Sequence, residues 1–258
     1  MRQALGLTWA REERRNKMES PSALDRVIFA LDVPSIEEAR DWVRRLPLKH
    51  FKVGLELFTQ EGPAAVGAVA ESGGRVFLDL KLHDIPSTVA GTMAAAVQAG
   101  VFLITVHTAG GPEMMRRAAA AAKEASERRG VPRPAVLGLT VLTSLDGGAL
   151  RAVGVDREVM DLVVSRALLA RECGLDGVVA SPAEAAAVRS ACGEDFLIVT
   201  PGIKMGARVG DDQRRVATPA KALGRGADYL VVGRAIRTAP DPVAALAQIE
   251  QDIRRWER

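Results

Sequence analysis

The stretch Val76-Phe77-Leu78-Asp79-Leu80-Lys81-Leu82-His83-Asp84-Ile85-Pro86-Ser87-Thr88 starts as an apolar β-strand and then adds charged residues. Residues two apart share one face of a strand, so Asp79 and Lys81 point the same way, with Leu78 and Leu80 on the opposite face. A buried carboxylate beside a buried ammonium costs free energy unless the two serve each other or a reaction. Alone, the pair fits either a structural ion pair or a reactive site.

Composition bounds the size and the partners of the protein. The chain has 258 residues, 48% apolar and 26% charged, which is enough for one large domain or two small ones. Aromatic residues are only 4%, which argues against single-stranded nucleic-acid binding, because such binding uses stacking platforms. The net charge is +3, and residues 1–20 carry +2 of it. The nearly neutral body predicts neither a nucleic-acid partner nor binding to an anionic membrane.

The sequence shows no sign of export from the cytoplasm or of insertion into a membrane. Cys173 and Cys192 show neither a disulfide framework nor metal-ligand spacing. No apolar run reaches the ~18 residues of a membrane span. At the N-terminus, Trp9-Ala10 leads straight into charged residues, so a signal peptide's apolar core is missing. We expect a cytoplasmic protein with a flexible tail over residues 1–22 and one catalytic domain over residues 23–258.

Apolar segments alternate with helical patterns along the whole chain. The expected strands are residues 26–32, 50–54, a segment starting at 76, 101–107, 135–142, 177–180, 196–200 and 228–232. Helix starts are marked by Ser35 with Glu38 three residues on, and by Thr218-Pro219. Eight strand–helix units in about 230 residues predict an α/β protein with a single (β/α)8 TIM barrel. A doubly wound open sheet is the alternative, but Leu31-Asp32-Val33-Pro34 lacks the glycines of its phosphate-binding turn.

Polar residues gather at the ends of the expected strands, where a (β/α)8 barrel carries its active site. They are Asp32, Lys52, Asp79 with Lys81, His107, Thr143 with Ser144, Gly202 with Lys204, and Gly233 with Arg234. Each has a structural explanation: Asp32 could cap a helix, Lys52 could extend to the rim, and we interpret His107 as a core histidine. Their joint occurrence at one face of the barrel favours function, because loops on that face carry function.

The last two strand–helix units predict an anion site, since loops after strands seven and eight often bind phosphate in these barrels. Gly233 lets the backbone approach an anion, and helix-start N–H groups can face it. Arg234 offers a two-pronged donor for phosphate oxygens. The loop around Gln213 could close over the ligand and exclude water.

Four charged side chains predict a reactive array. Asp32, Lys52, Asp79 and Lys81 would alternate carboxylates with ammoniums, each holding its neighbours charged. A charged lysine held rigidly at a barrel mouth is a proton donor, because a Schiff-base nucleophile requires a neutral amine.

Taken together, the motifs resemble those of the orotidine 5′-phosphate decarboxylase family, from about residue 26 to about residue 250. They are Phe51-Lys52-Val53-Gly54, Phe77 to Pro86 with Thr88, Val141 to Ser144, Thr200 to Ile203, Gly210 to Arg215, and Val232-Gly233-Arg234. The resemblance implies decarboxylation of orotidine 5′-monophosphate to UMP, the final step of pyrimidine (UMP) biosynthesis, without metal or cofactor. It also implies a homodimer with shared active sites.

The resemblance assigns roles to individual residues. Lys81 would donate a proton to C6 of the pyrimidine, and Asp79 would press on the substrate carboxylate and hold Lys81. The remaining assignments are Asp32 and Lys52 at the ribose, Thr143 and Ser144 at the pyrimidine, Gln213, Gly233 and Arg234 at the phosphate, and catalytic Asp84 with Ile85 and Thr88 in the partner subunit's site.

One position departs from the family pattern, which usually has Arg after Pro-Gly-Ile where this chain has Lys204. Lysine keeps the charge but loses the planar fork, so a direct ligand contact is less strongly implied there than at Arg234. We keep Lys204 among the expected substrate-binding residues.

Two rival functions remain open. Mg²⁺-dependent sugar-phosphate decarboxylases and aldolases share the D-x-K-x-x-D pattern, but Ile85-Pro86, Thr88 and the loop at residues 212–215 argue against them. The second rival is a non-catalytic nucleotide-binding barrel that keeps only the phosphate site. The complete set of Asp79, Lys81 and Asp84 argues against that reading.

Overall fold

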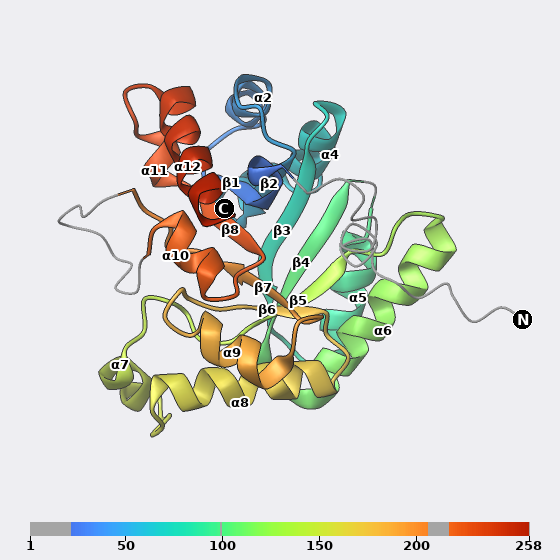
Figure 1. Ribbon diagram of the computed structural model, residues 1–258. Coiled ribbons are helices and arrows are strands. Elements are labelled where there is room, and N and C mark those ends of the chain that lie inside the picture. Colours follow the sequence, from blue (N-terminus) through green and yellow to red (C-terminus); the bar gives the residue numbers. More distant parts are fainter. Residues whose placement is uncertain (1–21, 99, 206–216, 258) are drawn as a thin grey trace, which may run out of the picture.

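The computed structural model describes residues 22–98, 100–205 and 217–257. Eight strands, β1 to β8, form a closed barrel in sequence order, and the helices form a ring around it (Figure 1). The predicted (β/α)8 barrel is therefore confirmed, and the open sheet is excluded. Gln213 and residues 1–21 of the expected tail lie outside the described residues.

All strand pairs are parallel, and β1 pairs with β8 to close the barrel. The strands are β1 Val27–Leu31, β2 His50–Gly54, β3 Arg75–Leu82, β4 Val101–His107, β5 Ala135–Leu139, β6 Gly177–Val179, β7 Leu197–Thr200 and β8 Tyr229–Val232. Strand β5 ends before the expected residue 142. Its partner β6 is short, and the pairing of Leu139 with Val179 is the last in their ladder.

Helices follow the strands. They are α2 Ile36–Arg45, α3 Leu55–Glu61, α4 Ala64–Glu71, α5 Pro86–Ala96, α6 Gly111–Arg129, α7 Gly147–Ala152, α8 Val159–Glu172, α9 Ala185–Cys192, α10 Pro219–Gly224, α11 Arg234–Arg237 and α12 Pro242–Trp256, with 3-10 turns η1 Ala23–Arg26 and η2 Thr108–Gly110. The Ser35 hydroxyl accepts the Glu38 N–H and caps α2 as the sequence indicates. In the described part of the chain, no helix is long and apolar enough to cross a membrane.

Alternation along the strands divides the core into two layers. In β1, Val27, Phe29 and Leu31 pack outward against the helices, while Ile28 and Ala30 point into the barrel. Aliphatic side chains make up most of both layers, together with buried aromatic residues such as Phe29 and Phe51 in the outer layer and Phe77 in the inner layer. The same parity places Asp32 after β1, Pro201 after β7 and Gly233 after β8 at the mouth of the barrel.

Candidate active site

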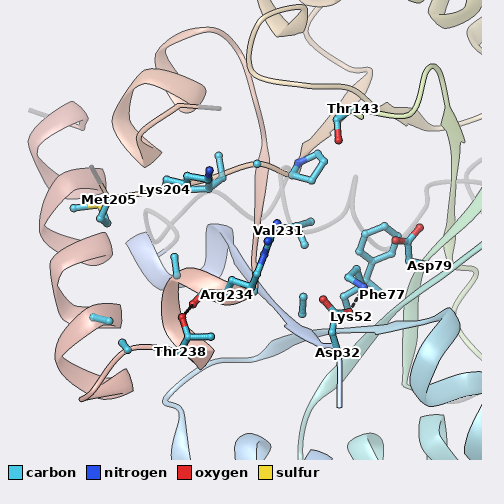
Figure 2. A pocket seen from close by; sticks show the side chains of 18 of the residues that line it. Asp32, Lys52, Phe77, Asp79, Thr143, Lys204, Met205, Val231, Arg234 and Thr238 are labelled. Carbon is cyan, nitrogen blue, oxygen red and sulfur yellow. Dashed lines mark hydrogen bonds and ion pairs between the residues drawn. The ribbon is translucent and has the colours of Figure 1, made fainter. Parts of the chain in front are cut away.

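A cavity of about 730 Å³ opens at the carboxyl ends of the strands (Figure 2). Its floor is formed by the top of the inner core: Ala30, Phe77, Leu139, Val179 and Val231. Charged side chains stand on its walls. In Figure 2, Asp32, Lys52 and Asp79 lie on one side of the cavity, and Lys204 with Met205 on the other.

Most of the residues selected from the sequence line this cavity. They are Asp32, Lys52, Asp79, Lys81, Thr143, Lys204, Gly233 and Arg234. Four others do not line it and are exposed on the surface: Asp84, Ile85, Thr88 and Ser144. Ile85 is 64% exposed, and it is one of several large hydrophobic residues that are exposed in the described part of the chain.

Strands β1 and β2 position the first ion pair. Lys52 occupies an inward position of β2, and its Nζ lies 2.9 Å from Oδ1 of Asp32, which follows β1. Gly54 makes room for this arrangement, because a Cβ at that position would stand only 2.6 Å from the Lys52 Nζ. The side chain of Lys52 is only 12% exposed, so the pair is partly shielded from water.

Strand β3 positions the second ion pair. The Lys81 Nζ donates to Oδ2 of Asp79 at 2.7 Å, and Asp79 is buried. Lys81 has a φ of 51°, a left-handed conformation that costs a non-glycine residue roughly 1–2 kcal/mol. This backbone strain accompanies the placement of both charges at the mouth of the barrel.

The two pairs stay separate. Strand pairing sets Gly54 opposite Asp79 but Lys52 opposite Phe77, so Lys52 lies one inward step below the β3 carboxylate. In the described part of the chain, Lys52 pairs with Asp32 and Lys81 pairs with Asp79, and no ion pair joins one of these pairs to the other. The predicted four-membered array is thus present as two pairs on one wall of the cavity.

Sequence reasoning missed Thr105, a buried residue of β4. Its hydroxyl lies 3.0 Å from Oδ1 of Asp79 and 2.9 Å from the backbone nitrogen of Lys81. Strand parity could have identified it, because Thr105 is two residues from Leu103, an inward position of the same strand. Its polarity within an apolar run was the available signal.

The expected anion-binding residues lie where β8 leads into helix α11. Gly233 caps the short helix α11, which begins at Arg234. A Cβ on Gly233 would lie 3.2 Å from that of Ala30, so the chain passes close to β1 here. Helix α12 adds Ala244, Ala245 and Gln248 to the cavity wall. A search for polar residues at the ends of strands could not have selected them, because they lie within a helix.

His107 lies beside the site rather than in the cavity lining. Its ring stacks on His83 with centroids 5.0 Å apart, and its Nδ1 accepts the Ala109 N–H. Burial, followed by the charges of His83, Arg166 and Lys81, lowers the pKa of His107 to about 4. The ring is therefore neutral at pH 7. In the described residues, no group of three His, Cys, Asp or Glu side chains could hold a metal ion.

The fold and the cavity define the class: a (β/α)8-barrel protein with paired charges over an apolar floor at its carboxyl-terminal mouth. A sequence profile described as "Orotidine 5'-phosphate decarboxylase / HUMPS family" matches residues 25–249. The chain belongs to this family.

Named relatives agree with that assignment. An orotidine 5'-phosphate decarboxylase of Moorella thermoacetica is 55% identical over 234 residues, covering 90% of this chain and 93% of the relative. That of Trichlorobacter lovleyi is 51% identical, covering 92% and 98%. Among solved structures, an orotidine 5'-phosphate decarboxylase from Lactobacillus acidophilus superposes with a TM-score of 0.77 at 35% identity, covering 88% of this chain and 98% of that one.

Proposed function

We propose that this protein decarboxylates orotidine 5′-monophosphate to UMP and CO₂ in pyrimidine biosynthesis, without a cofactor. The observation that carries the proposal is the Asp79–Lys81 pair, 2.7 Å apart, at the edge of an apolar floor. Arg234, which also lines the cavity, supplies a cation suited to the 5′-phosphate. Family membership over most of the chain supports the same reaction.

The chemistry needs a fixed cation at C6 of the pyrimidine. When the bond from C6 to the carboxylate breaks, CO₂ leaves and the electron pair stays on C6, where the ring stabilises it poorly. The Lys81 ammonium would stabilise that charge and then transfer its proton to C6, giving UMP. Its partner Asp79 holds the ammonium in place and would lie against the substrate carboxylate, where like charges repel.

Binding of the remote parts of the substrate would assist the reaction. We assign Asp32 and Lys52 to the ribose hydroxyls, and Gly233 and Arg234, with Lys204, to the phosphate. Thr143, on the cavity wall, would contact the pyrimidine. Binding energy from the phosphate can then be used to orient and desolvate the reacting end. Gln213 and Ser144 keep their expected phosphate and pyrimidine roles as proposals.

We further propose a cytoplasmic homodimer with shared sites. Asp84, Ile85 and Thr88 are exposed and stand outside this chain's own cavity. An exposed isoleucine between two polar residues suits burial against a second copy of the chain. In that dimer, Asp84 of each subunit would complete the neighbour's site.

The decisive assay is decarboxylation of orotidine 5′-monophosphate in excess EDTA. We expect turnover to persist at the same rate, since no step uses a metal. Loss of all activity in EDTA, restored by Mg²⁺, would support the metal-dependent sugar-phosphate alternative. UMP binding without any turnover would support a non-catalytic barrel.

Substitution of the proposed proton donor tests the mechanism. Lys81→Ala should lower kcat by at least 10³-fold, on the order of the effect of losing a catalytic acid together with its charge. UMP should still bind, because its phosphate contacts are separate. Lys49→Ala is a suitable control, since Lys49 is 66% exposed and pairs with Asp25. Near-normal turnover of Lys81→Ala would refute the proton-donor role.

Mixing two inactive variants tests the shared sites. Lys81→Ala and Asp84→Ala would each lack one essential group. In a mixed dimer, one of the two sites would receive both intact residues. Random exchange of equal amounts makes about half of the dimers mixed, so about a quarter of all sites should regain function. Absence of any recovery, despite subunit exchange shown by mass spectrometry, would count against shared sites.

A further inference from the structure

Thr105 is a polar residue inside an otherwise apolar strand. Strand β4 reads Val-Phe-Leu-Ile-Thr-Val-His, and Thr105 is fully buried. It lies below the rim and is not part of the cavity lining, so a substrate contact is not its role. A buried hydroxyl requires hydrogen-bond partners, and those partners indicate what the side chain does.

Both partners of the Thr105 hydroxyl belong to the reactive segment of β3. Its oxygen lies 3.0 Å from Oδ1 of Asp79. The backbone N–H of Lys81 donates to the same oxygen at 2.9 Å. Because an ionised carboxylate only accepts, the single hydroxyl proton goes to Asp79 and a lone pair receives the Lys81 N–H. One hydroxyl thus joins the carboxylate to the backbone of the lysine.

The strand register explains why a side chain is needed there. Leu78 pairs with Ile104, but the next pair is Leu82 with Val106, so β3 uses four steps where β4 uses two. Within this irregularity, the regular backbone hydrogen bonds between β3 and β4 are interrupted. The Thr105 hydroxyl takes the place of a backbone carbonyl for Lys81, at the residue whose φ is 51°.

The two carboxylate oxygens of Asp79 therefore have different tasks. Oδ1 accepts from Thr105, while Oδ2 accepts from the Lys81 ammonium. Since Thr105 is buried within the sheet, it restrains the rotation of the Asp79 carboxylate. Restraining the carboxylate also restrains the ammonium paired with it.

We propose that Thr105 is a positioning residue for decarboxylation, which holds the Asp79 carboxylate and the Lys81 backbone in the reactive geometry through one hydroxyl. This inference rests on the proposed function. It assigns no direct contact with the substrate to Thr105. Its effect should appear in kcat rather than in ligand binding, because the proposed phosphate and ribose contacts lie on other strands.

The test compares Thr105→Val, Thr105→Ser and Thr140→Val. Valine keeps the shape and removes the hydroxyl, while serine keeps the hydroxyl. Thr140 is a matched control, because it is equally buried and its hydroxyl donates at 3.0 Å to a backbone carbonyl, that of Val179. For each variant, kcat and KM for orotidine 5′-monophosphate, UMP affinity and the unfolding midpoint in urea are measured.

We expect Thr105→Val to lose about 10- to 100-fold in kcat, the scale of a small misplacement of reacting groups. Its UMP affinity should stay within about threefold of the parent, and Thr105→Ser should keep most of the parental kcat. Thr140→Val should lose comparable stability without that loss of kcat. Should Thr105→Val not fold, Thr105→Ala is measured at lower temperature by the same criteria.

Three results would overturn the inference. They are an unchanged kcat in folded Thr105→Val, an equal loss of kcat in Thr140→Val, and a Thr105→Ser variant as slow as the valine variant. If the parent itself fails to decarboxylate orotidine 5′-monophosphate, the proposed function fails instead. The two failures are therefore distinguishable.

Discussion

At the scale of single residues, the site depends on a missing side chain as well as on charges. Gly54 has an ordinary negative φ, so an alanine would not strain its backbone. The difficulty is local, because the added Cβ would stand 2.6 Å from the Lys52 Nζ. The flexible end of Lys52 can move away at little cost in stability, but then it leaves Asp32.

We therefore predict that Gly54→Ala separates activity from stability. The KM for orotidine 5′-monophosphate should rise about tenfold, the loss of one charge-assisted contact, while the free energy of unfolding changes by less than about 1 kcal/mol. Steady-state kinetics and urea unfolding measure the two quantities. Gly67→Ala is the matched control, because its Cβ would meet only the Glu71 carboxylate, at 4.0 Å. Equal KM values in both variants would contradict the prediction.

The sequence located these charged residues at the barrel mouth, but it did not identify the residues that support them. Strand alternation was sufficient to place Asp79 and Lys81 on one face, since the period of two is a local property. The left-handed Lys81 backbone and the Thr105 contact depend on how β3 pairs with β4, and pairing register is not a local property. The geometry around Asp79 and Lys81 therefore could not be predicted from the sequence.

At the scale of elements, apolar runs located the strands because buried parallel strands are nearly continuous in hydrophobicity. Helix α3 was missed because Gly54 at its N-cap provides no side-chain cap and the helix follows β2 without a loop. The end of β5 was misplaced because it depends on the length of its neighbour β6. Both errors concern connections between elements.

One side chain holds several such connections together. Arg189, on α9, donates to the carbonyl oxygens of Gly193 and Phe196 before β7, and to that of Gly226 before β8. It also forms a 2.8 Å ion pair with Asp228, and both side chains are largely buried. Removing the guanidinium would take away the cation that pairs with Asp228 and the donor to these carbonyl oxygens.

We predict that Arg189→Ala lowers the free energy of unfolding by about 3 kcal/mol, the usual scale for breaking a buried pair from one side. Arg254→Ala should leave it almost unchanged, because Arg254 pairs with Glu250 one helical turn away on the surface. Urea unfolding followed by circular dichroism measures both. Similar losses in the two variants would show that the loop contacts of Arg189 are not stabilising.

At the scale of the whole molecule, the two ends of the barrel differ in chemistry. The carboxyl-terminal mouth carries the ion pairs, while aromatic rings pack at the amino-terminal end. There, the His50 ring packs at a tilt against Phe102, with centroids 4.6 Å apart, and meets Tyr229 edge-on at 5.7 Å. His50 is 1% exposed, and neither ring nitrogen has a hydrogen-bond partner among the described residues.

This buried ring makes the barrel sensitive to acid. Burial, reinforced by Arg75 and Lys49 and opposed by Asp25, lowers the pKa of His50 from 6.5 to about 4. The unfolded chain therefore binds a proton between these two values that the folded chain does not bind. Stability is fully present above pH 6.5, and falls as the pH is lowered from 6.5 to about 4. The contribution of His50 to this loss is about 3 kcal/mol.

We accordingly predict that His50→Phe, which keeps an aromatic ring in the same packing, reduces the acid sensitivity of folding. Between pH 7 and pH 4 the free energy of unfolding should fall by about 3 kcal/mol less in the variant than in the parent. Urea titrations at half-unit pH intervals measure the difference, which also cancels the contribution of carboxylates common to both proteins. At pH 7 the variant should be at least as stable, because no buried ring nitrogen is left without a partner. Parallel pH profiles for the two proteins would show that His50 is protonated equally in the folded and unfolded chains.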